Sequence, residues 1–252
     1  MTPLTIAAAQ STSVAGDLAT NIVRHQRFMQ VAAEQGVQLL VFPELSLTGY
    51  ERGLAAGLAI VPDAKVLQPL RDFAREVGVT SVVGMPIRLA DDSPVLIGAL
   101  VFGADGSLEV YSKQHLHPGE EVAFAPGTGG SMLTIGTDTV ALAVCADFSH
   151  TRHAASAAEQ GAALYAAGVL ITENGYAPDT ALLQGYANTH SMTVLMANHG
   201  GATGGWESAG RSAIWASDGS LIAAAPGTGN VMVVARREAG EWRGHIVDIP
   251  EA

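Results

Sequence analysis

The stretch ALAVCADFSH, residues 141–150, decides the fold expected for this chain. It opens with an apolar run and turns polar directly after Cys145, the single cysteine of the sequence. An apolar run with a sharp end is typical of a strand buried on both faces of a sheet. A thiol just beyond such a strand lies where open α/β sheets place their reactive groups. A lone cysteine is more often a small buried hydrophobe than a nucleophile, so the rest of the chain has to decide between these interpretations.

The chain before this stretch alternates strand-like and helix-like segments. Asp17 is typical of a helix N-cap, Gly36 follows the expected end of that helix, and Pro69 falls in the first turn of a second helix. A strand, a helix and a strand within about 40 residues form a βαβ unit, which implies parallel strands. We expect strands at 4–10, 37–42 and 79–89, and helices between residues 17 and 36 and over about 66–77.

The middle and the end of the chain add antiparallel segments. The turn signal at 104–107 joins two strand-like runs, and the loop 112–130 is rich in glycine, proline and charge. We expect further strands at 95–102, 107–112, 132–135, 139–145, 163–168, 193–198, 211–216, 221–225, 231–236 and 242–249, and helices at about 150–160 and 177–191. Without a repeat or a linker, the sequence predicts one domain over residues 1–252 and a layered α/β sandwich.

The composition narrows the class of partner. The chain is 48% hydrophobic and only 15% charged, where a typical soluble domain has about 25% charged residues. We therefore expect that much of the surface is covered by other copies of the chain, in a homodimer or a higher homo-oligomer. The net charge of −11 argues against nucleic acid and anionic membranes as partners. One cysteine, no charged leader and no apolar run of about 18 residues favour a soluble, cytoplasmic protein.

Three polar side chains follow strand-like runs at the points where those runs stop. They are Glu44, Lys113 and Cys145. Taken singly, Glu44 has a plain explanation as a turn residue and Lys113 as a solvated edge charge. Taken together, an acid, a cation and a thiol suit acyl transfer: the acid takes the thiol proton and the cation stabilises the thiolate and then the oxyanion.

Three motifs carry a resemblance to a known family. VFPELSLTGY (41–50), YSKQHLHPGEEVAFAPG (111–127) and VCAD (144–147) together resemble the carbon–nitrogen hydrolase, or nitrilase-like, superfamily. The resemblance runs from the opening strand that ends at Gln10 to the segment 209–234, AGRSAIWASDGSLIAAAPGTGNVMVV. It implies a four-layer α-β-β-α sandwich with mixed sheets.

The resemblance also implies residue roles. Glu44 takes the position of the general base, Lys113 that of the lysine and Cys145 that of the nucleophile. A second glutamate of the family falls on Glu120 or Glu121, and we favour Glu120. Many members continue after the cysteine with an Arg and a Pro that are absent here, where the chain reads CADFSH. This departure leaves the triad intact and leaves the shape of the substrate pocket undetermined.

Further residues are candidates for the substrate pocket. A backbone N–H near Ala146 is expected to bind the oxyanion, His150 is a candidate pocket residue, and Glu173 and Tyr176 either line the mouth or belong to an ordinary loop, the interpretation we slightly favour. Trp206 lies in a glycine-rich loop that is expected near the site. His150 and His153 have a spacing that can bind a metal, but a third ligand is not evident. We expect neither a metal nor an organic cofactor.

The predicted function is hydrolysis of a small carboxamide through a cysteine thioester, with release of ammonia. Nitriles and N-carbamoyl compounds are alternatives because the same triad serves them. A catalytically silent oligomeric binding protein and a thiol redox sensor are alternatives of other classes. With the roles that the resemblance implies, replacing Lys113 by alanine is expected nearly to abolish turnover without unfolding the protein.

Overall fold

The computed structural model describes residues 3–250 of the chain, which fold into two stacked β-sheets with helices on both outer faces. The seven-stranded sheet has the order β13-β12-β1-β2-β3-β4-β5. Its parallel centre, β1 to β3, is extended by antiparallel strands on both sides. Its strands are β1 (Leu4–Gln10), β2 (Leu39–Val41), β3 (Thr80–Ile87), β4 (Leu96–Phe102), β5 (Leu108–Ser112), β12 (Val231–Glu238) and β13 (Glu241–Asp248).

The six-stranded sheet has the order β11-β10-β9-β8-β7-β6. Strands β7, β8 and β9 run parallel, and β6, β10 and β11 continue the sheet in antiparallel fashion. Its strands are β6 (Leu133–Ile135), β7 (Asp138–Val144), β8 (Leu164–Val169), β9 (Thr193–Asn198), β10 (Ala213–Trp215) and β11 (Leu221–Ala224). Both sheets are therefore mixed, as the sequence predicts.

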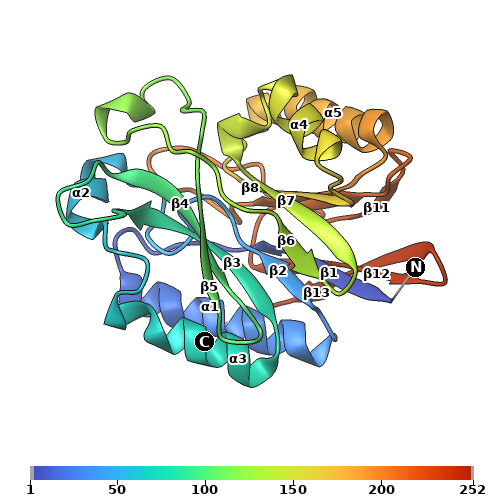
Figure 1. Ribbon diagram of the computed structural model, residues 1–252, viewed down its shortest axis with the longest axis horizontal. Coiled ribbons are helices and arrows are strands. Elements are labelled where there is room, and N and C mark those ends of the chain that lie inside the picture. The colour runs from blue at the N-terminus through green and yellow to red at the C-terminus, as the bar shows by residue number, and fades with distance from the viewer. Residues whose placement is uncertain (1–2, 251–252) are drawn as a thin grey trace.

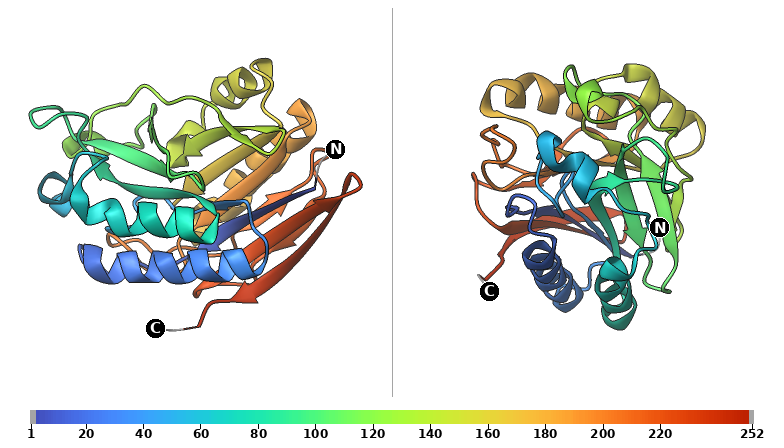
Figure 2. Two further views of the ribbon diagram at one scale, coloured as in Figure 1. Left: turned by 60° about the horizontal axis from the view of Figure 1, so that its bottom comes forward. Right: turned by 90° about the vertical axis from the view of Figure 1, so that its left-hand side faces the viewer.

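Helices cover the outer face of each sheet, which makes four layers (Figures 1 and 2). Helices α1 (Leu18–Glu34) and α3 (Gln68–Val77) pack on the seven-stranded sheet, and α4 (Thr151–Glu159) and α5 (Glu173–His190) pack on the six-stranded sheet. The short helix α2 (Ala55–Leu58) lies beyond the carboxyl ends of β2 and β3. Within residues 3–250, none of the helices has the length and apolarity needed to cross a bilayer.

The stretch that opens the sequence analysis is buried on both faces. In β7, Leu142 and Val144 point into the core between the two sheets. Ala141 and Ala143 point outward into the core beneath α4 and α5. Because both faces of this strand are covered, an uninterrupted apolar run is what the fold requires. The prediction of a doubly buried strand before Cys145 is confirmed.

Local signals in the sequence also correspond to the observed helix ends. The side chain of Asp17 caps α1 by accepting the backbone N–H of Thr20 at 3.0 Å. Pro69 lies in the first turn of α3, where its missing N–H costs no helical hydrogen bond. The start of α5 differs from the prediction of about residue 177. The helix already begins at Glu173, and Pro178 lies inside it.

Candidate active site

The three polar stops meet at one edge of the sandwich, between the two sheets. Glu44 follows β2, Lys113 follows β5 and Cys145 follows β7. The backbones approach so closely here that a Cβ on Gly168 of β8 would lie 2.6 Å from the carbonyl oxygen of Phe42. Only glycine permits this contact. It brings the loop that carries Glu44 against the sheet that carries the thiol.

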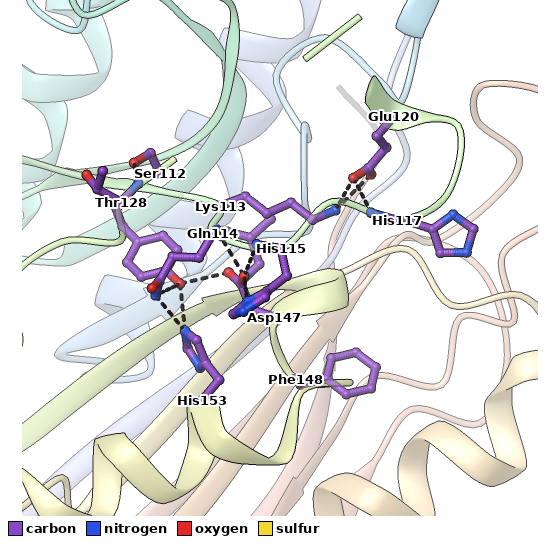
Figure 3. Close-up of polar contacts among 12 residues, drawn as sticks. Ser112, Lys113, Gln114, His115, His117, Glu120, Thr128, Asp147, Phe148 and His153 are labelled. Carbon is purple, nitrogen blue, oxygen red and sulfur yellow. Dashed lines mark hydrogen bonds and ion pairs between the residues drawn. The ribbon is translucent and has the colours of Figure 1, made fainter. Parts of the chain in front are cut away.

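Lys113 forms the centre of a buried cluster of charges. Its Nζ donates to Glu44 Oε1 at 2.7 Å and to both oxygens of Glu120, at 2.7 and 2.8 Å. The side chains of all three residues are inaccessible to solvent. Figure 3 shows the contacts between Lys113 and Glu120. Two carboxylates surround one ammonium group, so the negative charges outnumber the positive one. One of the carboxylates can therefore take up a proton.

Glu120 is the glutamate that contacts the lysine. Besides Lys113, it accepts hydrogen bonds from the Tyr50 hydroxyl at 2.6 Å and from the backbone N–H of His117 at 2.7 Å. Glu121 is exposed, and within residues 3–250 it accepts only from the Gly119 N–H, at 2.7 Å. Of the two candidates left by the sequence, the geometry therefore favours Glu120.

The electrostatics of the cluster make Glu44 a weak acid. Burial raises the pKa of Glu44 to about 7, although the charge of Lys113 opposes the rise. Burial by itself would lower the pKa of Lys113, but the charges of Glu44, Cys145 and Glu120 hold it above its ordinary value. Glu44 Oε2 is buried and has no hydrogen-bond partner in the described part of the chain. This oxygen is free to exchange a proton with a group in the pocket.

Cys145 occupies a sharp turn at the end of β7. It begins a 3₁₀ turn, Cys145–Asp147, with a φ of 43°, a left-handed conformation that non-glycine residues rarely adopt. Backbone strain of this kind is found most often at active sites and ligand-binding sites. Burial, and then the charge of Glu44, raise the pKa of the thiol, whereas Lys113 lowers it. The thiol is therefore protonated at rest and needs a base in order to react.

Asp147 ties the cysteine turn to the lysine loop. Its Oδ1 accepts the backbone N–H groups of Gln114 and His115, at 3.0 and 2.8 Å. Its Oδ2 accepts the Val144 N–H at 3.1 Å and the Tyr111 hydroxyl at 2.7 Å. Figure 3 shows this carboxylate between the two segments. One buried side chain thus sets the position of Lys113 relative to Cys145.

We expect the substitution Asp147→Asn to lower kcat more than its effect on folding explains. Asparagine has an NH₂ group in place of one carboxylate oxygen, so the donors that now bond to that oxygen lose their acceptor. This loss costs about 1–3 kcal/mol of stability. A shift of about 1 Å in the lysine loop would cost about 10²-fold in turnover. Urea unfolding and steady-state kinetics measure the two effects.

The matched control for this prediction is Asp218→Asn. Asp218 also accepts hydrogen bonds from a backbone N–H and a hydroxyl, both of Ser220, but it lies in an exposed turn. Its replacement should leave kcat unchanged. Wild-type kcat in Asp147→Asn would show that this carboxylate does not position the reacting groups.

A pocket of about 260 Å³ opens onto Cys145 and Glu44. Its lining combines apolar, aromatic and polar side chains. Ala146 and Trp206, both named from the sequence, lie in the lining. The remaining lining residues are Tyr50, Arg52, His117, Phe148, Ser149, Leu170, Ile171, Thr172, Gly175 and Asp179.

Three residues that the sequence suggested for substrate binding do not line this pocket. His150 is exposed and stacks on His115, with ring centroids 3.9 Å apart. Glu173 is exposed and pairs with Arg211. The Tyr176 hydroxyl donates to the Arg211 carbonyl at 2.8 Å.

The first turn of α5 explains two of these corrections. Glu173 and Tyr176 are helical, so the favoured interpretation as loop residues was wrong. Proline is unfavourable inside a helix, which is why the sequence suggested a later start. The helix nevertheless continues through Pro178, and the Thr180 hydroxyl donates to the Tyr176 carbonyl at 2.6 Å. Because the first turn is helical, these two side chains point away from the pocket and toward Arg211.

His199, which is not among the residues predicted from the sequence, supports Glu44. His199 follows β9 and is fully buried, and its Nε2 donates to the carbonyl oxygen of Glu44 at 2.7 Å. Burial lowers its pKa to about 4, so the ring is neutral at pH 7. Leu45, the next residue after Glu44, has a φ of 52°. The rule that located the other groups, a polar residue where an apolar strand stops, applies to His199 as well.

Comparison with known proteins gives consistent matches at the level of sequence. A family model described as carbon-nitrogen hydrolase matches residues 5–243. A nitrilase of Pyrococcus abyssi is 31% identical over 147 residues, 56% of this chain and 55% of that protein. A glutamine-dependent NAD(+) synthetase of Thermotoga maritima is 31% identical over 153 residues, 58% of this chain and 26% of that protein. The match therefore spans about half of the first relative and about a quarter of the second.

Solved structures match over more of their length. A double mutant of the amidase from Nesterenkonia sp. AN1, in complex with acrylamide, has a TM-score of 0.84 and 25% identity and covers 94% of this chain and 91% of its own. A mutant of that amidase with the acetamide moiety of fluoroacetamide added to its active site cysteine has a TM-score of 0.84, 26% identity and coverages of 93% and 90%. Saccharomyces cerevisiae Nit3, of the nitrilase superfamily, has a TM-score of 0.85, 19% identity and coverages of 93% and 89%. These likenesses confirm the predicted α-β-β-α sandwich.

Proposed function

The chain belongs to the carbon–nitrogen hydrolase family, and on that premise we propose that it cleaves the C–N bond of a small carboxamide and releases ammonia. The resemblance seen in its three motifs is thereby confirmed. The observation that carries the proposal is the buried Lys113 between two carboxylates, one of which keeps a free oxygen in the pocket of the thiol. The solved amidase structures with acrylamide and with an added acetamide moiety support an amide as substrate.

In the first half of the proposed reaction, Cys145 is acylated. Glu44 Oε2 accepts the thiol proton as the sulfur attacks the amide carbon, and the C=O electron pair moves onto oxygen. Lys113 and the N–H of Ala146, in the first turn of the short 3₁₀ segment where N–H groups lack helical acceptors, stabilise that oxyanion. When the intermediate collapses, the C–N bond breaks and the nitrogen takes the proton from Glu44. Ammonia leaves and a thioester remains.

In the second half, water hydrolyses the thioester. Glu44 accepts a proton from water as its oxygen attacks the thioester carbon, and the same donors bind the second oxyanion. The C–S bond then breaks, and the sulfur recovers the proton from Glu44. The products are a carboxylic acid and the free thiol, so the cycle closes without a redox change. Glu120 holds Lys113 in place through both halves.

We expect kcat/KM to rise as the pH rises through about 7, because burial raises the pKa of Glu44 to about 7 and the base works only when it is ionised. At lower pH the carboxyl is already protonated, so the rate should fall about tenfold per pH unit. Initial rates of ammonia release on both sides of neutrality measure the profile. A rate that stays flat down to the ordinary carboxyl pKa of about 4.3 would show that the pKa of the base is not raised.

Ammonia release from a panel of aliphatic, aromatic and ω-amides tests the proposed function, with Cys145→Ala as the control. Cysteine-dependent ammonia is the expected result. Addition of hydroxylamine should divert the acyl group from water to a hydroxamate, which reports the thioester. If nitriles or N-carbamoyl compounds turn over in place of amides, the triad is retained and the substrate class is corrected. If no compound of the panel releases ammonia and the thiol of Cys145 does not react, a binding protein would be favoured.

A further inference from the structure

One acidic side chain of the pocket lining has neither a hydrogen bond nor an ion pair within residues 3–250. Asp179 projects from α5 into the pocket lining and is half-buried. Its carboxylate makes no hydrogen bond and no ion pair within the part of the chain that the structure describes. A Cβ on Gly175, one turn earlier in α5, would lie 3.1 Å from Asp179 Oδ2, so the glycine leaves room for the carboxylate. A half-buried charge without a partner is costly, and a ligand of opposite charge relieves that cost.

The basic side chains of the lining, Arg52 and His117, already have hydrogen-bond partners in the protein. Arg52 donates to the Gly119 carbonyl at 3.1 Å, and its guanidinium lies 5.9 Å from the centre of the Tyr50 ring. His117 Nδ1 bonds to the carbonyl of the next residue at 3.0 Å. Burial raises the pKa of Asp179, and the influence of His117 opposes this rise only in part. Among the charged residues of the lining, only Asp179 lacks a hydrogen bond in the described structure.

We propose that the substrate is an amide with an ammonium group at the end remote from the scissile bond, and that Asp179 binds this group. The inference rests on the proposed function, because it names the substrate class of the same pocket. Trp206, a lining residue that is 43% exposed, supplies an aromatic face suited to a cation. Phe148, Leu170 and Ile171 offer an apolar wall for the methylene groups between the two ends. The net charge of −11 also draws cations toward the protein.

The first test compares three amides of matched shape. They are hexanamide, aminopentanamide, in which an ammonium group replaces the terminal methyl group, and the monoamide of adipic acid, in which a carboxylate replaces it. The wild type should favour the cationic over the neutral amide by about fivefold or more in kcat/KM, the value of a partly screened ion pair. The carboxylate-bearing amide should be the poorest substrate. Added salt should reduce these differences.

Two variants of equal charge separate local recognition from the general field of the protein. Asp179→Asn should bring the cationic-to-neutral ratio of kcat/KM close to one. Glu173→Gln removes the same charge from the same helix, but Glu173 is outside the pocket lining and pairs with Arg211. It should keep the wild-type ratio. An equal ratio in Asp179→Asn and the wild type would overturn the inference even while amide hydrolysis itself is upheld.

The second test does not depend on turnover. Because Cys145 is the only cysteine of the chain, thiol reagents report on this pocket alone. We would compare labelling by aminoethyl, sulfonatoethyl and methyl methanethiosulfonate, each rate divided by that of a free thiol in solution. The cationic reagent should be preferred over the anionic one in the wild type and in Glu173→Gln, but not in Asp179→Asn. A preference in Asp179→Asn as large as that in Glu173→Gln would contradict the inference, whether or not any amide is hydrolysed.

Discussion

Replacing Lys113 by alanine should abolish turnover and also lower the free energy of unfolding by about 3–5 kcal/mol. The second effect follows from burial. Nζ bonds to Glu44 and Glu120, and all three side chains are shielded from water. Without the ammonium group, two carboxylates remain in one buried site with no counter-charge. Loss of a single oxyanion donor by itself costs about 10²–10³ in rate.

This expectation replaces the one drawn from the sequence, in which the variant loses activity and stays stable. Denaturant unfolding followed by tryptophan fluorescence, together with ammonia release, measures both effects. Lys65→Ala is the matched control because Lys65 is the other lysine of the chain and is exposed. It should change stability by no more than about 0.5 kcal/mol. Wild-type stability of Lys113→Ala would show that the carboxylates tolerate the loss, and wild-type turnover would refute the proposed role of the lysine.

Replacing Glu44 by glutamine should have the opposite balance of effects. The amide can still accept the hydrogen bond from Lys113, and Glu120 remains as a counter-charge, so the fold should be kept. The reaction loses its base, which is worth about 10²–10⁴ in rate. The thiol should also lose its reactivity, because its raised pKa leaves it protonated without a proton acceptor.

Steady-state kinetics and the rate of alkylation of Cys145 measure this prediction. Glu121→Gln provides the control, since Glu121 lies next to Glu120 in sequence but points into solvent. That variant should behave as the wild type does. Substantial turnover in Glu44→Gln would mean that another group takes the thiol proton. Loss of folding together with activity would mean that the charge of Glu44 is needed to balance Lys113.

Much of the fold was predictable because local rules govern its elements. The apolar run before Cys145 is buried on both faces. Asp17 and Pro69 mark the starts of two helices through interactions that involve only neighbouring residues. The same kind of rule placed Glu44, Lys113 and Cys145 at strand ends. The start of α5 was not predictable in this way, because the helix tolerates Pro178 in its interior.

The sequence by itself determined the alternation of strands and helices, the residues that end the strands and, through its motifs, the family. Only the tertiary structure decided how those residues interact. Glu44 and Lys113 are 69 positions apart, and Glu44 and His199 are 155 apart, yet each pair is hydrogen-bonded. Burial raises the pKa of Glu44, and Asp179 lines the same pocket without a hydrogen bond in the described part of the chain. Desolvation and pairing depend on the distances between groups in space, which local sequence patterns do not specify.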